Sequence, residues 1–175
     1  MAKLKLDSNS EQNILNMLMD SSSLSTDQIS KINATSPEIG KSKLETAIEL
    51  NFTDESKIQK VLSTNYSLEL ISLEKKVIDP KIKKIIDLRY LQDNLLVPFE
   101  MSGGVLKIAI ADASKLGLMK NLKTITKMEP ELYAATISDI NDFIDRMSRQ
   151  DTKNIINKLF IRVNFTGKKS YRSKN

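Results

Sequence analysis

The spacing of hydrophobic residues in the first third of the chain predicts a repeated helical hairpin. Apolar positions at helical spacing are followed by a polar turn, a capping residue and a second apolar set, and the whole pattern returns 29 residues later. The first copy contains Ile14, Leu15, Leu18 and Met19, then Ser25, Ile29 and Ile32, and the second contains Leu44, Ala47 and Ile48, then Asp54, Ile58 and Val61. We therefore expect a helical repeat subdomain over residues 11–63, preceded by a flexible N-terminus over residues 1–10.

After residue 67 the pattern changes to short apolar runs that alternate with helical ones. Strands are expected over residues 68–73, 95–100, 105–110 and 131–136, with Pro98 typical of an edge strand and Gly103-Gly104 typical of a hairpin turn. Asp79-Pro80, Asp112 and Ser138-Asp139 are placed to start the intervening helices.

This order predicts an α/β subdomain over residues 68–148, arranged β-α-β-β-α-β-α around a small mixed sheet. Together with the helical repeat it gives an α+β fold. Residues 149–175 are expected to form a basic C-terminal helix or tail.

Composition removes several classes of chemistry. The chain of 175 residues has no cysteine and no histidine, so it has neither disulfides nor the commonest general base and metal ligand. The carboxylates form no convincing catalytic pair, and no apolar run is long enough to span a membrane. We therefore expect a cytoplasmic protein that is not an enzyme and holds no cofactor or metal.

The basic charge of the chain is concentrated in its last residues. The net charge is +5, but residues 153–175 carry seven basic side chains and no acid, which leaves −2 for residues 1–152. A basic nucleic-acid-binding body is therefore not expected. The tail fits a final helix with a solvated end, an anchor on anionic lipid, a dock on an acidic partner, a weak RNA contact or an added strand. Its candidate contact residues are Lys158, Arg162, Lys168, Lys169, Arg172 and Lys174.

These elements resemble the N-terminal domain of the traffic ATPases that drive type II secretion and type IV pilus assembly, called MshEN in its cyclic-di-GMP-binding form. The resemblance covers about residues 11–148. It is carried by the helical repeat, by Ile78-Asp79-Pro80, by the hairpin from Leu95 to Ile110, by Ala111-Asp112-Ala113 and by the segment from Thr136 to Ile140.

The resemblance implies a ligand set that this chain has lost. The arginine and two glycines of the family's repeat fall on Asn13, Leu15 and Ser22 in the first copy, and on Ser42, Leu44 and Asn51 in the second. Glycine permits close approach to the backbone and arginine offers a fork for phosphate or guanine, so leucine at the inner positions disfavours a nucleotide. The Walker A loop of the family's ATPase domain is also missing, since Gly167-Lys168-Lys169-Ser170 lacks its spacing.

The resulting interpretation is a non-catalytic docking module of a secretion or pilus machinery at the inner membrane. Its partner is expected to be an inner-membrane platform protein or a traffic ATPase, with the tail adding attraction to a membrane or partner. One alternative is a cyclic-di-GMP sensor with a degenerate pocket. Another is a nucleic-acid-associated protein that acts through its basic tail.

Overall fold

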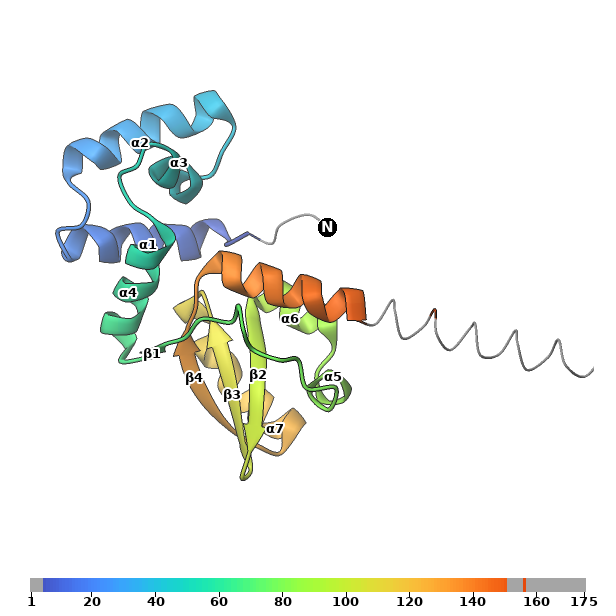
Figure 1. Cartoon of the computed structure of the whole chain (residues 1–175). Helices are drawn as coiled ribbons and strands as arrows, with labels where there is room; N and C mark the ends of the chain where they lie inside the picture. Colours follow the sequence, from blue (N-terminus) through green and yellow to red (C-terminus); the bar gives the residue numbers. More distant parts are fainter. Residues whose placement is uncertain (1–4, 151–155, 157–175) are drawn as a thin grey trace, which may run out of the picture.

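The computed structural model describes residues 5–150 and residue 156. Within that part, helices make up the N-terminal half, and a mixed sheet with helices on both faces makes up the rest (Figure 1). The predicted α+β fold is confirmed. The helices of the first half are α1 (Ser8–Asp20), α2 (Thr26–Ile39), α3 (Lys43–Glu49) and α4 (Glu55–Tyr66).

The internal repeat is visible in the backbone hydrogen bonds of two matching turns. After α1, the amides of Ser22 and Ser23 donate to the carbonyls of Met19 (2.8 Å) and Leu18 (2.8 Å). After α3, the amides of Asn51 and Phe52 donate to Ile48 (3.0 Å) and Ala47 (3.0 Å). Each set is a Schellman motif, and the two are displaced by the same 29 residues as the sequence pattern.

Both turns lead into helices with matching caps. The Ser25 hydroxyl accepts from the Gln28 amide at 3.2 Å, and an Asp54 carboxylate oxygen accepts from the Lys57 amide at 2.8 Å. The apolar faces of these helices meet in one cluster, in which Leu15, Leu18 and Ile32 are fully or almost fully buried. The hydrophobic repeat therefore closes on itself to form the core of this half.

The sheet has the strand order β1-β4-β3-β2, with β2 antiparallel to β3 and the other pairs parallel. The edge position expected from Pro98 is confirmed, as is the Gly103-Gly104 hairpin, where both glycines have positive φ. The bounds of the elements are β1 (Glu69–Leu70), α5 (Ile82–Ile85), α6 (Leu88–Asn94), β2 (Leu96–Ser102), β3 (Val105–Ile110), the 3-10 helix η1 (Ala113–Leu118), α7 (Met119–Thr126) and β4 (Glu129–Ala134).

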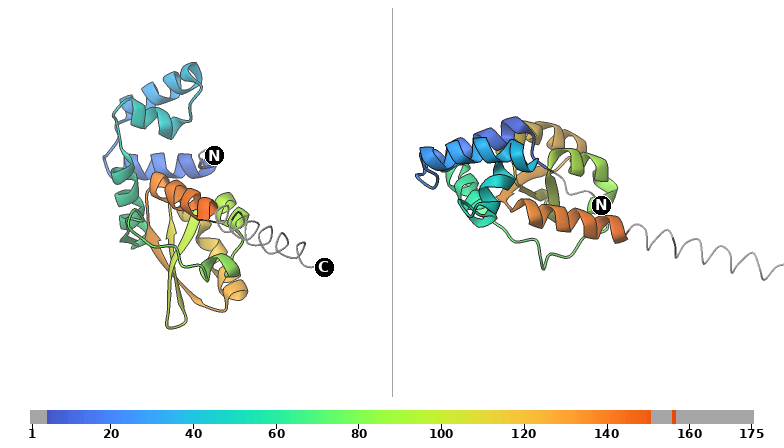
Figure 2. Two further views of the ribbon diagram at one scale, coloured as in Figure 1. Left: turned by 45° about the vertical axis from the view of Figure 1, so that its right-hand side comes forward. Right: turned by 90° about the horizontal axis from the view of Figure 1, so that it is seen from above.

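A last helix covers one face of the sheet over residues 137–150 of the described part (Figures 1 and 2). Its apolar face is the expected one, and Ile140, Phe143, Ile144 and Met147 are all at most 1% exposed. Its cap differs from the expectation. The Thr136 hydroxyl, rather than Ser138 or Asp139, accepts from a first-turn amide, that of Asp139 at 3.0 Å.

The helix expected after Asp79-Pro80 is divided in two. Ile86 is extended, with φ −131° and ψ 133°, so α5 is one turn long and Asp87 caps a separate helix, α6. Asp79 still caps a turn, because its carboxylate accepts from the Lys81 amide at 2.8 Å. The first strand is also shorter than expected, because residues 71–81 leave the sheet after pairing with the end of β4.

Candidate functional site

A groove of about 390 Å³ lies where α3, the start of α1 and the start of the last helix meet. Its floor is apolar and its sides are charged. We call it the acidic groove, and define it by the apolar residues Leu6, Leu44, Ile48 and Ile137 and the charged residues Glu11, Glu45, Glu49, Glu55, Lys5 and Lys41.

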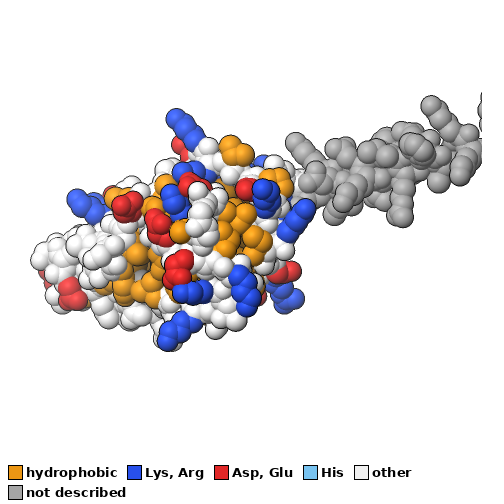
Figure 3. All heavy atoms as spheres, turned by 90° about the horizontal axis from the view of Figure 1, so that it is seen from below, with side chains coloured by type: hydrophobic (Ala, Val, Ile, Leu, Met, Phe, Trp, Pro, Cys, Tyr) orange, Lys and Arg blue, Asp and Glu red, His pale blue; other side chains and the backbone are white. Residues whose placement is uncertain are grey.

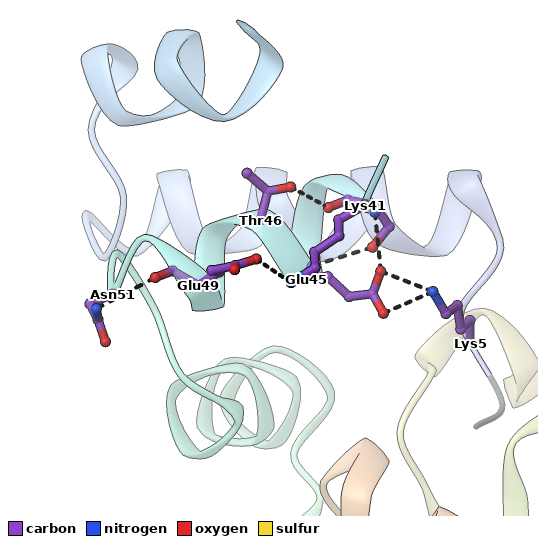
Figure 4. A network of polar contacts seen from close by, with 7 residues as sticks. Lys5, Lys41, Glu45, Thr46, Glu49 and Asn51 are labelled. Carbon is purple, nitrogen blue, oxygen red and sulfur yellow. Dashed lines mark hydrogen bonds and ion pairs between the residues drawn. The ribbon is translucent and has the colours of Figure 1, made fainter. Parts of the chain in front are cut away.

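Ion pairs use both lysines of the acidic groove. Lys5 Nζ lies 2.9 Å from Glu45 Oε1, and Lys41 Nζ lies 2.5 Å from Glu49 Oε2 (Figure 4). The hydrogen bond from Lys5 holds the pKa of Glu45 below its ordinary value. The lining contains four carboxylates and two lysines, so its net charge is negative. This charge favours cationic ligands over phosphates.

The other two carboxylates connect parts of the fold. Glu55, the first residue of α4, accepts from the amide (3.1 Å) and the hydroxyl (2.7 Å) of Ser138 in the last helix. Glu11 on α1 lines the groove with Ser42 at the start of α3, and burial raises the pKa of Glu11 above its ordinary value. The acidic groove is thus built from residues of both halves of the protein.

The six positions matched to the family's ligand residues do not form one site. Ser42 and Leu44 line the acidic groove, whereas Asn13, Leu15, Ser22 and Asn51 do not. Leu15 and Leu44 are each 2% exposed within the helical core, so their side chains hold the hairpins together. Ser22 and Asn51 are the left-handed residues of the two Schellman motifs, both with φ 56°.

A second depression of about 330 Å³ lies beside the first of these turns. It is lined by Ser21, Ser23, Lys57, Lys60, Val61, Thr64 and Asn65. Its lysines suit an anion better than the acidic groove does, although Lys57 lies 3.8 Å from Asp54.

The predictions for the basic tail concern residues beyond the described part of the chain. The tail residues Lys158, Arg162, Lys168, Lys169, Arg172 and Lys174 lie outside the described residues. Within residues 5–150, no group of acidic side chains is arranged to hold a metal ion. No helix in the same region has the length and apolar character needed to cross a bilayer.

Sequence reasoning did not find the acidic groove. Glu11, Glu45 and Glu49 read as ordinary exposed positions of amphipathic helices, and only the packing of α3 against α1 and the last helix brings them together. Asp112 was interpreted as a helix cap, and it does accept from the Ser114 amide at 2.9 Å. It also accepts from the hydroxyl of Ser10 on α1 at 2.7 Å, a contact between the halves that no local pattern indicates.

Comparison with known proteins gives one family and a consistent set of relatives. Residues 66–154 match the MshEN domain. Over 93 residues the chain is 29% identical to the type IV pilus assembly ATPase PilB of Myxococcus xanthus (strain DK1622). That alignment covers 53% of this chain but only 16% of the relative, so the chain spans a small part of that ATPase.

Solved structures share the fold across both halves. A structure of MshE with cdg has a TM-score of 0.58 at 21% identity, covering 76% of this chain and 96% of that chain. The N-terminal domain of XpsE has a TM-score of 0.57 at 20% identity, covering 82% and 98%. At these identities the likeness establishes the fold.

Proposed function

Because this chain belongs to the MshEN domain family, we propose that it is a non-catalytic docking module of a secretion or pilus machinery at the inner membrane. The family match and the PilB relative give the context of secretion and pilus ATPases, and neither assigns a catalytic residue to this chain. The proposed partner is a protein of that machinery, either an inner-membrane platform protein or a traffic ATPase.

The observation that carries the proposal is the chemistry of the acidic groove. Its apolar floor suits hydrophobic side chains, and its excess of carboxylates suits lysine or arginine. The same carboxylates oppose a nucleotide, whose phosphates would bring further negative charge. The partner segment is therefore proposed to be a short basic and apolar stretch of polypeptide.

The buried leucines support protein binding over nucleotide binding. MshE has been solved with cdg, so a cyclic dinucleotide is the natural competing ligand. The resemblance matches Leu15 and Leu44 to the inner glycines of the repeat, and both leucines pack in the core. Access to the backbone at these points would require the loss of two core side chains, at roughly 2–5 kcal/mol each.

The test is site-specific crosslinking in native cells followed by mass spectrometry. A photo-crosslinking residue at Ile48, on the floor of the acidic groove, is expected to capture a component of a secretion or pilus machinery. The same residue at Ile39, which is 42% exposed and lies at the end of α2 outside this groove, is the matched control.

Charge reversal sharpens the assignment to the acidic groove. Glu49→Lys is expected to abolish the Ile48 crosslink, whereas Glu38→Lys on the exposed end of α2 is expected to leave it intact. Capture that is indifferent to Glu49→Lys would refute the proposed groove. Calorimetric binding of cyclic-di-GMP at micromolar concentration would refute the loss of the nucleotide site.

A further inference from the structure

A basic surface lies on the other half of the protein, away from the acidic groove. Residues 75–84 contain five lysines and one aspartate, although residues 1–152 together carry a net charge of −2. They form the end of the irregular segment after β1 and most of α5. We call the lysines at positions 75, 76, 81, 83 and 84 the lysine platform.

The lysine platform keeps much of its charge available to solvent. Lys75, Lys81 and Lys84 are exposed, and within the described residues no ion pair joins them to an acid. Lys76 is half-buried, lying 3.8 Å from Glu100 and over the Phe99 ring. The charges of these three lysines are therefore available to attract an anionic partner.

The lysine platform is held rigidly by the last helix. Arg146 donates to the carbonyls of Leu73 (2.6 Å) and Lys76 (3.0 Å), which fixes the irregular segment. Lys83 Nζ donates to the Met147 carbonyl at 2.5 Å, which places α5 against the end of the same helix. Figure 1 shows α5 below that end, where the chain continues into its basic tail.

An exposed aliphatic side chain stands among the lysines. Val77 is 84% exposed, while its neighbour Ile78 is 6% exposed and anchors the segment in the core. Ile156 at the start of the tail is 47% exposed. Viewed from below, basic and acidic side chains are interspersed with hydrophobic ones (Figure 3).

Clustered lysines with an aliphatic residue fit an anionic bilayer better than they fit nucleic acid. Lysines attract the headgroups of acidic lipids, and a valine can enter the interface between headgroups and acyl chains. Proteins that bind single-stranded nucleic acid combine a basic groove with aromatic side chains on which bases stack, and residues 75–84 contain no aromatic side chain. The nearby acid Glu100 forms an ion pair with Lys107.

We propose that the lysine platform and Val77 form a peripheral docking surface for anionic phospholipid bilayers. This surface is separate from the acidic groove, so the two proposals stand or fall independently. The tail supplies long-range attraction, and the lysine platform fixes the orientation of the folded body on the membrane.

The test is flotation of the full chain with two kinds of vesicle. One is made of phosphatidylcholine alone, and the other contains about 30% phosphatidylglycerol to mimic an anionic membrane. Binding is expected only to the anionic vesicles and is expected to disappear in 0.5 M salt, where charges are screened within about 4 Å. The variant K75Q/K81Q/K84Q is expected to bind on the order of 100-fold more weakly, at about fivefold per lysine.

The matched control carries the same charge change elsewhere. The variant K31Q/K57Q/K60Q neutralises three exposed lysines of the helical half and is expected to bind within about twofold to threefold of the unmodified chain. Val77→Ser is expected to weaken binding severalfold without altering its salt dependence. Circular dichroism spectra of the variants serve as the control for folding.

Three results would overturn the proposal. Equal loss of binding in both triple variants would show that net charge alone acts. Unchanged binding of K75Q/K81Q/K84Q would assign all membrane contact to the tail. Binding to single-stranded RNA, lost in that variant, with no binding to vesicles would assign the surface to nucleic acid.

Discussion

At the residue scale, Ser22 and Asn51 occupy positions that the family resemblance matches to the outer glycine of the repeat. Both residues adopt φ 56° at the end of a repeat helix, a conformation that glycine adopts without steric cost. The outer glycine of the repeat therefore has a sufficient explanation in helix termination. The inner position, where Leu15 and Leu44 are buried, is the one that bears on ligand access.

We predict that Ser22→Gly stabilises the protein by about 0.5 kcal/mol, because the relief of left-handed strain exceeds the extra entropy of glycine when unfolded. Asn51→Gly is expected to be close to neutral, since asparagine tolerates this conformation. Urea unfolding measures both. Ser30→Gly inside α2 is the control and should lower stability by about 0.5 kcal/mol. A destabilised Ser22→Gly variant would contradict the strain at this turn.

Glu11 in the acidic groove gives a prediction about pH. Burial raises its pKa above the ordinary value of 4.5, so the folded state retains this proton to a higher pH than the unfolded state does. Its contribution to stability is thus most favourable below 4.5 and is lost as pH rises through the folded pKa. Glu11→Gln should therefore gain stability relative to the unmodified chain as the pH rises from 4.5 through the raised pKa of the folded state.

Denaturant titrations across this pH range measure the difference in unfolding free energy. Glu38→Gln, on the exposed end of α2, controls for the loss of one negative charge. If the difference between Glu11→Gln and the unmodified chain fell with rising pH, the burial of Glu11 would not govern its titration.

At the element scale, the sequence predicted the order of strands and helices better than their lengths. Apolar periodicity and Gly103-Gly104 were sufficient for the hairpin, because their signals are local. The break at Ile86 has a weaker local signal, because only the capping residue Asp87 marks it. Ile82, Ile85, Ile86 and Leu88 continue an apolar helical face across it without glycine or proline. Tertiary packing of Ile82 and Ile86 in the core overrides that local preference.

The irregular segment over residues 71–81 depends on the last helix for its shape. Arg146 supplies two hydrogen bonds to its carbonyls, and its guanidinium lies 5.0 Å from the centre of the Phe143 ring. We predict that Arg146→Met lowers stability by about 1–2 kcal/mol and speeds amide exchange in this segment. Hydrogen exchange with mass spectrometry measures this, with Arg149→Met on the exposed end of the helix as the control.

A local role for Arg146 requires that the exchange be confined. Faster exchange throughout the sheet, or no change near Lys76, would show that the clamp does not determine the shape of the segment. In the first case Arg146 would support the whole core. In the second, Leu73 and Ile78 would hold the segment through their burial alone.

At the scale of the whole molecule, the site was less predictable than the fold. The family resemblance matches Ser42 and Leu44 to ligand positions, and both residues line the acidic groove. Their neighbours in it come from residues 5–11 and 137–141, far away in sequence. Contacts of this kind follow from how the halves pack. Gln59 illustrates this by donating to the carbonyls of Ile71 (3.1 Å) and Ala134 (2.7 Å) from α4.

The buried carboxylate of Asp112 provides the sharpest test of how the halves are joined. It accepts from Ser10 Oγ at 2.7 Å across the junction and from Ser114 Oγ at 2.8 Å within its own half. Ser10→Ala removes only contacts across the junction, those of its hydroxyl with Asp112 and with Ser114 Oγ (3.2 Å). Ser114→Ala removes the hydroxyl of the cap together with the weaker contact to Ser10. Each should cost about 1.5–3 kcal/mol, because a hydrogen bond to a charged acceptor is lost.

The two variants should differ in where the protein loosens. In Ser10→Ala, amide exchange is expected to rise in α1 and the rest of the helical half before the sheet is affected, because the halves are less tightly coupled. In Ser114→Ala, the rise should centre on η1. Identical exchange patterns in the two variants would mean that Asp112 acts on the core as a whole, and that the halves unfold as one cooperative unit without a separable junction.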